Sequence, residues 1–214
     1  LMNVLRKTDS SYGFLWSKNP DAAVEKWHFN VMQDAIKEPI VSGVMGIDIG
    51  CGCGYDTFIM AKNNPGVKLV SVDISDGVYN TARISRELNN VRPIKCSISD
   101  MPLKENIFDF AYSFGVLHHT LNPQKCLLEI GRILKKGRPV FLYLYEDHSE
   151  NQFKFIAVKV ITGIRRLTVR LPHKTIYLLS WLFSPFVFAL FTLPAKVLGN
   201  FRLTRRFADK IPFN

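Results

Sequence analysis

The sequence predicts an α/β fold: an open, mostly parallel sheet with helices on both faces, followed by a C-terminal hydrophobic, basic helical segment. Two observations predict the sheet. Short apolar, β-branched runs alternate with amphipathic stretches between residues 44 and 145, and a glycine-rich turn follows the first run. Strands that alternate with helices favour parallel pairing through right-handed crossovers. A third observation, the change in charge and hydrophobicity near residue 150, predicts the separate helical segment.

The expected elements follow one another in a regular order. Asp21 suits the N-cap of a helix over residues 21–37, and Pro39 follows the end of that helix. Helices are expected at 55–63, 77–88 and 124–134 and strands at 44–49, 68–73, 93–97, 107–114 and 138–145. The ligand of such a sheet binds at the carboxyl ends of its strands.

The glycine-rich turn predicts a ligand site. Gly50, Gly52 and Gly54 let the backbone approach a ligand and adopt positive φ. Their G-x-G-x-G spacing differs from the G-x-G-x-x-G of dinucleotide enzymes, which disfavours a nicotinamide oxidoreductase. Asp48 precedes the turn and suits a ligand that carries an ammonium group. Asp73 ends the next strand, where a carboxylate can accept hydrogen bonds from both hydroxyls of a ribose.

Several motifs occur in a fixed order over residues 44–145. They are Ile47-Asp48-Ile49-Gly50-Cys51-Gly52-Cys53-Gly54, Val72-Asp73-Ile74-Ser75, Met101-Pro102-Leu103, Phe108-Asp109-Phe110-Ala111, Gly115-Val116-Leu117-His118-His119-Thr120 and Arg132-Ile133-Leu134-Lys135-Lys136-Gly137. With these motifs the chain resembles the class I S-adenosylmethionine-dependent methyltransferases, in particular the group that includes the quinone-biosynthesis C-methyltransferases. The resemblance implies a Rossmann-like fold and S-adenosyl-L-methionine as cofactor.

The resemblance also implies roles for single residues. The methionine part of the cofactor would be held by Asp48 and by the backbone of Gly50, Cys51 and Gly52. The ribose would be held by Asp73, and the sulfonium would face Phe114 and Gly115. The adenine would be bound by Ile74, Ser97 and Ile98.

One of these positions departs from the family pattern. Ser97 stands where the family has an acid that accepts a hydrogen bond from the adenine amino group, and Asp100 is an alternative acceptor. The sequence therefore leaves two functions open. The first is methyl transfer to a small-molecule or lipid-linked acceptor, and the second is a catalytically idle cofactor-binding or membrane-associated module.

His118 and His119 are the candidate catalytic residues, because they follow the fourth strand at the ligand end of the sheet. An imidazole titrates near neutral pH, so either could remove a proton from the acceptor. The alternative is that the pair shapes the loop and the start of the next helix. No metal site is expected: the four cysteines show neither a zinc pattern nor a disulfide framework, which favours reduced thiols in the cytoplasm.

Residues 151–214 contain 11 Lys or Arg and one acid, whereas residues 1–150 contain 17 of each sign, so the net charge of +10 lies in the last third. Residues 175–195 carry no charge. A transmembrane anchor, a helical lid over the substrate cleft and an interfacial hairpin on a membrane surface are the alternatives. Ser184 and Pro185 are expected to split the run into two helices, which disfavours the anchor. We favour the lid, because residues 165–172 and the aromatic run after them resemble such an insertion in other methyltransferases. A nucleic-acid partner is disfavoured.

Three parts are therefore expected. Residues 1–43 form an N-terminal segment and helix that cover the cofactor site, 44–149 the methyltransferase core, and 150–214 a basic hydrophobic insertion or lid. The final strands of a methyltransferase sheet are not recognisable, so we expect a longer protein. Its location is expected to be cytoplasmic, either free or at a membrane surface. The acceptor and the oligomeric state are not predicted.

Overall fold

The computed structural model describes residues 43–145, 151–168 and 171–200, together with Phe14, His28, Asn30 and Val31. The chain divides into two compact units, Leu1–Tyr145 and Glu146–Asn214, and each is described by itself. The expected helix over residues 21–37 lies outside the described residues, except that His28, Asn30 and Val31 are helical.

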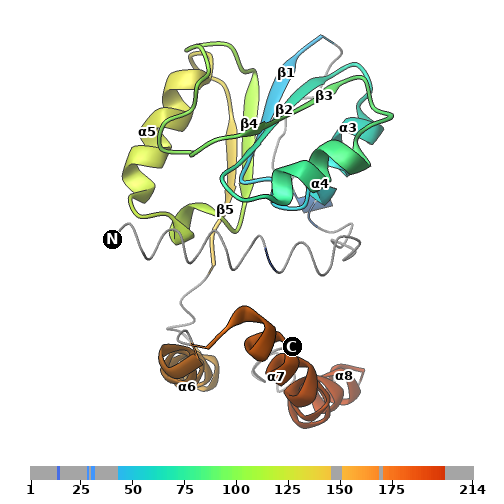
Figure 1. Cartoon of the computed structure of the whole chain (residues 1–214), viewed down its shortest axis with the longest axis vertical. Helices are drawn as coiled ribbons and strands as arrows, with labels where there is room; N and C mark the ends of the chain where they lie inside the picture. Colours follow the sequence, from blue (N-terminus) through green and yellow to red (C-terminus); the bar gives the residue numbers. More distant parts are fainter. Residues whose placement is uncertain are drawn as a thin grey trace. The chain divides into compact units, whose positions relative to one another are not determined.

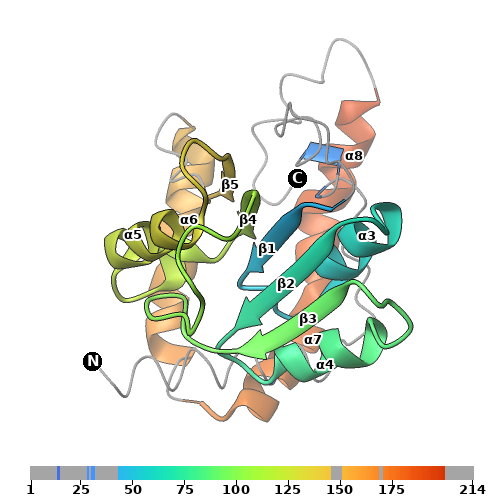
Figure 2. The same cartoon turned by 90° about the horizontal axis from the view of Figure 1, so that it is seen from above.

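The first unit contains a five-stranded sheet in the order β3-β2-β1-β4-β5 (Figures 1 and 2). All four neighbouring pairs are parallel. The strands are β1 (Met45–Ile49), β2 (Lys68–Asp73), β3 (Val91–Lys95), β4 (Phe110–Phe114) and β5 (Val140–Tyr143). The predicted fold class, a parallel α/β sheet with helices, is confirmed.

Helices cover both faces of this sheet. In Figure 1, α5 (Pro123–Ile133) lies on one face, and α3 (Tyr55–Asn63) and α4 (Gly77–Ile84) lie on the other. Both faces are buried in separate apolar clusters. Ile47 and Ile49 of β1 pack with Ile130 and Ile133 of α5, whereas Phe110 and Tyr112 of β4 pack with Met60 of α3. Apolar residues on both faces explain why these strands appear in the sequence as nearly continuous hydrophobic runs.

The expected strand over residues 107–114 begins later than predicted. The N–H groups of Ile107 and Phe108 both donate to the Ile133 carbonyl at the end of α5, at 2.9 and 3.1 Å. The carboxylate of Asp109 then accepts a hydrogen bond from the Met45 N–H. These residues therefore connect β1 and α5, and the regular strand pairing starts at Phe110.

The described part of the second unit is helical. It contains α6 (Gln152–Thr168), α7 (His173–Val187), the π-helical segment η2 (Phe188–Thr192) and α8 (Leu193–Gly199). The prediction that Ser184 and Pro185 split the apolar run is wrong: α7 continues through Pro185. A proline removes one backbone hydrogen bond and crowds the preceding turn. The wider π-helical turns that begin three residues later are a known way of absorbing such a mismatch.

Candidate cofactor-binding site

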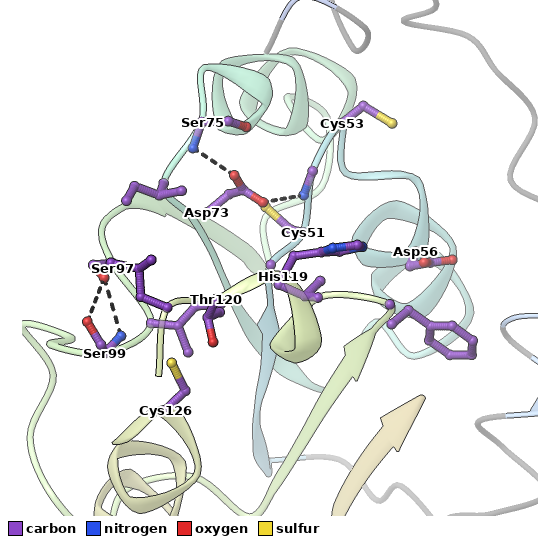
Figure 3. Close-up of a pocket in the computed structure, with 18 of the residues that line it drawn as sticks. Cys51, Cys53, Asp56, Asp73, Ser75, Ser97, Ser99, His119, Thr120 and Cys126 are labelled. Carbon is purple, nitrogen blue, oxygen red and sulfur yellow. Dashed lines mark hydrogen bonds between the residues drawn. The ribbon is translucent and has the colours of Figure 1, made fainter. Parts of the chain in front are cut away.

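A cavity of about 470 Å³ lies in the first unit, lined by residues that follow the carboxyl ends of the strands (Figure 3). The chain passes from β1 outward to β2 and β3 and then returns to pair β4 with the other side of β1. Ligands of open α/β sheets bind at such a reversal of strand order. The cavity volume is in the usual range for small-molecule sites.

The glycine turn that follows β1 forms one wall of the cavity. The N–H groups of Gly50 and Cys51 both donate to the Val72 carbonyl of β2, at 2.8 and 3.0 Å. Gly50 has φ +80°, and a Cβ atom at this position would lie 2.5 Å from the Val116 side chain. Only glycine therefore allows the turn and the loop after β4 to approach this closely.

The Asp73 side chain joins the glycine turn to the loop after β2. Its two carboxylate oxygens accept hydrogen bonds from the N–H groups of Gly52 at 2.8 Å and Ser75 at 2.7 Å, shown as dashed lines in Figure 3. A carboxylate has about four acceptor positions, so this half-buried group keeps capacity for ligand hydroxyls. Asp73 therefore lies beside the glycine turn, as the sequence predicts.

Another part of the cavity lining combines apolar and hydroxyl side chains. Ile74 is 41% exposed and lines the cavity together with Ile98. The hydroxyls of Ser97 and Ser99 lie 3.0 Å apart and also line it. Asp100, the alternative acceptor for an adenine amino group, is exposed and does not line the cavity. Ser99 therefore supplies the second polar group at this place.

Asp48 lies in β1 just before the glycine turn but does not line the cavity. Its side chain is 3% exposed, is absent from the cavity lining and accepts a hydrogen bond from the Thr57 hydroxyl. Burial raises the pKa of Asp48 to about 8, and the nearby carboxylate of Asp56 contributes to the increase. The buried carboxyl of Asp48 therefore stabilises the start of α3 through Thr57. It has no surface in the cavity through which it could contact a ligand directly.

The two candidate catalytic histidines differ in position. His119 lines the cavity and His118 does not. Their rings lie 4.1 Å apart between centroids, and the Tyr145 ring lies 4.3 Å from that of His118. Among the described residues, neither ring nitrogen of His118 has a hydrogen-bond partner, and burial lowers its pKa. His118 thus packs against His119 and Tyr145 without lining the cavity, and His119 is the member of the pair that a ligand in the cavity can contact.

The remaining predicted residues, Gly52, Cys51, Phe114 and Gly115, all line the cavity. Several lining residues were not predicted. His28, from the N-terminal helix, has Nδ1 3.2 Å from an Asp56 carboxylate oxygen and stacks on Phe114 with ring centroids 4.2 Å apart. No spacing rule links a histidine at position 28 to a strand end at 114, so only the tertiary structure shows this contact.

The residues present fit a nucleoside cofactor. Asp73 offers carboxylate acceptors, the glycine turn offers a close backbone, and Ile74 and Ile98 offer apolar faces for a base. The part of the chain that the structure describes contains no group of three or more side chains that could hold a metal ion. The four cysteines, all of them in this unit, are free thiols.

Comparison with known proteins identifies the family. A family model described as "Methyltransferase domain" matches residues 40–164. The chain is 31% identical over 133 residues to cycloartenol-C-24-methyltransferase 1 of Oryza sativa, covering 58% of this chain and 36% of the relative. It is 30% identical over 142 residues to a tRNA U34 carboxymethyltransferase of Campylobacter jejuni, covering 64% and 46%. The chain thus spans about a third to a half of the length of these relatives.

A solved structure shows the same fold. The methyltransferase of Haloferax volcanii, in its complex with the activator Trm112, matches with a TM-score of 0.57 and 22% identity, over 66% of this chain and 64% of that chain. The family match covers more than half of the 214 residues and includes every strand of the sheet. This chain belongs to the methyltransferase domain family, the class I methyltransferases whose cofactor is S-adenosyl-L-methionine.

Proposed function

We propose that this protein transfers a methyl group from S-adenosyl-L-methionine to an acceptor bound in the same cavity. The observation that carries the proposal is the cavity at the reversal of strand order, which Asp73, the glycine turn, Ile74 and Ile98 line together. Asp73 would hold the ribose hydroxyls, and the two isoleucines would enclose the adenine. The cofactor supplies an activated methyl group, so the chain's own task is to align the acceptor with it.

We propose an apolar small-molecule or lipid-like acceptor. Phe114, Val116, Leu121 and Tyr145 also line the cavity, and apolar and aromatic side chains of this kind suit such a molecule. A relative that is named for its action on cycloartenol supports this acceptor class.

A nucleoside of tRNA is the second candidate acceptor. The similarity to a tRNA U34 carboxymethyltransferase favours it, and Lys125 at the cavity gives one cation near the site. A basic surplus in residues 151–214 would attract phosphates without regard to sequence. Our expectation against a nucleic-acid partner therefore stays a prediction that experiment has to test.

We assign His119 as the group that receives a proton if the acceptor must lose one. It is the member of the histidine pair that lines the cavity, beside the loop after β4. His118 and Tyr145 pack around it and restrict its ring. His119→Ala should lower kcat and alter the pH profile between about pH 5 and 8, the range in which an imidazole titrates. An unchanged pH profile would exclude His119 as the base.

Calorimetry with S-adenosylhomocysteine tests the cofactor assignment. Asp73→Ala should weaken binding at least about tenfold, the effect of losing charge-assisted hydrogen bonds worth about 1.5–3 kcal/mol. Asp76→Ala is the matched control, because Asp76 lies three residues away, pairs with Lys95 at the surface and does not line the cavity. Equal affinities of the two variants would overturn the ribose assignment.

The acceptor class is tested with radiolabelled S-adenosylmethionine. The protein is incubated in parallel with a cellular lipid extract and with total tRNA, and the label in each fraction is counted. Label in the lipid fraction supports the proposal, and label in tRNA supports the second candidate. Retained binding of S-adenosylhomocysteine with label in neither fraction would favour the alternative, a catalytically idle cofactor-binding module.

A further inference from the structure

The helix that runs through α7, η2 and α8 is long, apolar and exposed. It extends over His173–Leu198, 26 residues, with a mean hydropathy of 1.9 in its most apolar window, and none of that window is buried. Its large exposed side chains include Leu178, Trp181, Leu182, Phe183, Phe186, Phe188 and Leu190. Contiguous apolar surface of this extent is rare on monomeric soluble proteins and indicates a partner.

The dimensions of this helix match a lipid bilayer. Residues 175–195 are 21 consecutive residues without charge, which at 1.5 Å per residue extend about 31 Å, close to the roughly 30 Å hydrocarbon core. Lys174 and Lys196 stand one at each end of this stretch. Lysines at these places can extend their amines to the headgroups while their methylenes stay in the apolar region.

Polar groups within the uncharged stretch are compatible with this environment. The Ser180 hydroxyl donates to the Tyr177 carbonyl at 2.8 Å. Pro185 lies inside the helix, and η2 follows it without a break. Prolines and local π-helical turns are tolerated in membrane helices, where neighbouring backbone groups adjust their hydrogen bonds. The unbroken helix removes the reason for which the sequence disfavoured a transmembrane anchor.

The neighbouring helix α6 has a different character, suited to a membrane surface. Its 17 residues include Lys154, Lys159, Arg165 and Arg166 and no acid. It is too short and too charged to cross a bilayer. Exposed Ile156, Val160 and Ile164 recur at helical spacing among these cations. An amphipathic helix of this kind lies in the interface with its cations near anionic headgroups.

We propose that α7, η2 and α8 form one membrane-spanning helix and that α6 lies on the adjacent bilayer surface. The partner is a phospholipid bilayer. This inference is independent of the methyl-transfer proposal, because it rests only on the second unit. It goes beyond that proposal by giving the protein a fixed location, at which a lipid-like acceptor would be locally concentrated.

The test is cell-free synthesis of residues 1–214 in the presence of liposomes, followed by flotation and by extraction at alkaline pH. The chain should float with vesicles of neutral phosphatidylcholine and with vesicles that also contain phosphatidylglycerol, and it should resist extraction from both. Leu182→Arg combined with Phe186→Arg places two charges near the middle of the helix and should reduce the extraction-resistant fraction at least about tenfold.

The matched control is Leu127→Arg combined with Leu128→Arg, which changes two exposed apolar residues of α5 in the first unit. This control should float and resist extraction like the unaltered chain. The proposal is overturned if the unaltered chain fails to float, if alkaline extraction releases it, or if it binds only anionic vesicles and leaves them in high salt. It is also overturned if the helix variant behaves like the control.

Discussion

Asp73 has two roles that use the same carboxylate. It accepts hydrogen bonds from Gly52 and Ser75 and so fixes the two loops that form one side of the cavity. The same oxygens are the acceptors that a ribose would use. The geometry of this side chain is therefore set before any ligand arrives, and Asp73→Asn should preserve part of the loop structure while losing the charge that strengthens the ligand bonds.

The raised pKa of Asp48 predicts a pH-dependent stability. With a folded-state pKa of about 8 and an ordinary value of 3.8, the folded protein keeps a proton that the unfolded chain loses between these pH values. Asp48 therefore lowers the free energy of unfolding progressively as pH rises from about 4 to about 8. Asp48→Asn should flatten that slope and increase stability at about pH 8 relative to about pH 5, compared with the unaltered chain.

Urea denaturation at several pH values measures this effect. Asp76→Asn, at an exposed acid, is the control and should leave the slope unchanged. If Asp48→Asn leaves the slope unchanged as well, then Asp48 is ionised in the folded protein and our account of it is wrong.

Alanine substitutions at two glycines, Gly50 and Gly131, should change the stability of the protein in opposite directions. At Gly50, φ is +80° and a Cβ would collide with Val116, so Gly50→Ala should destabilise the protein by about 1–3 kcal/mol or more and weaken binding of S-adenosylhomocysteine. At Gly131, inside α5, a Cβ would meet nothing within 4 Å. Gly131→Ala should therefore stabilise the protein by about 0.5–1 kcal/mol.

Chemical denaturation of both variants measures these changes, and calorimetry measures the binding. A Gly50→Ala protein as stable as the unaltered chain would show that the loop after β4 moves away from the turn at little cost.

At the scale of single elements, strands and helices of the core were predictable because local signals agreed with tertiary packing. The predicted bounds of α3 and β2 match the structure, since each is enclosed by glycine or proline and shows one clear pattern. The apolar tail was mispredicted at Pro185, because a proline after serine is also the usual beginning of a helix. Whether such a proline begins a helix or lies inside one depends on the surroundings of the helix, and the local sequence does not specify those surroundings.

The junction of β1, β4 and α5 depends on one carboxylate. Asp109 accepts hydrogen bonds from the Met45 N–H at 3.0 Å and from Lys135 Nζ at 2.8 Å. Burial by itself would raise the pKa of Asp109, but these bonds and the charges of Lys135 and Arg138 outweigh it and hold the pKa below its ordinary value. Asp109→Ala should cost about 1–3 kcal/mol at neutral pH, because it leaves the Met45 N–H without its acceptor.

The pH dependence of this loss follows from the lowered pKa. Stability from Asp109 is present above its ordinary pKa of 3.8 and is lost as pH falls through the lower folded value. The difference between the unaltered chain and Asp109→Ala in urea should therefore shrink below about pH 4. Asp76→Ala, which removes an exposed ion pair, should change stability by less than about 0.5 kcal/mol. Equal losses for both variants would contradict the role of Asp109.

At the scale of the whole molecule, the reactivity of the four cysteines measures opening of the first unit, because all four lie in that unit. Cys51, Cys53 and Cys126 are buried and line the cavity, and no cysteine lies beyond residue 126. Burial also raises the pKa of the Cys51 thiol, which reduces its reactivity further. S-adenosylhomocysteine at about 100 times its Kd should slow thiol labelling about a hundredfold if labelling requires the cavity to open.

Labelling with a thiol reagent, followed by mass spectrometry, measures this protection at each cysteine. Detergent micelles, which would solvate the second unit, should leave the rates unchanged. Labelling that ignores the ligand would mean that the thiols react without opening of the site.

The distribution of function between the units could be predicted only in part. The charge surplus in residues 151–214 marks the second unit in the sequence, and the glycine turn with Asp73 marks one part of the cavity lining. His28, Leu121 and Tyr145 also line the cavity, but they come from distant segments and share no motif. Residues that come together only in the folded chain form no local sequence pattern, so this part of the cavity lining could not be predicted from the sequence.

The outer edge of β5 has a practical consequence for anyone who handles this protein. Among the described strands, β5 pairs only with β4, and its sequence Val140-Phe141-Leu142-Tyr143 contains no charge or proline. The opposite border, β3, carries Arg92, Pro93 and Lys95, which discourage further pairing. We therefore expect residues 1–214, kept in detergent that covers the apolar helix, to self-associate through β5 at high concentration, and Val140→Lys, at a side chain that is 41% exposed, to reduce this association in light scattering.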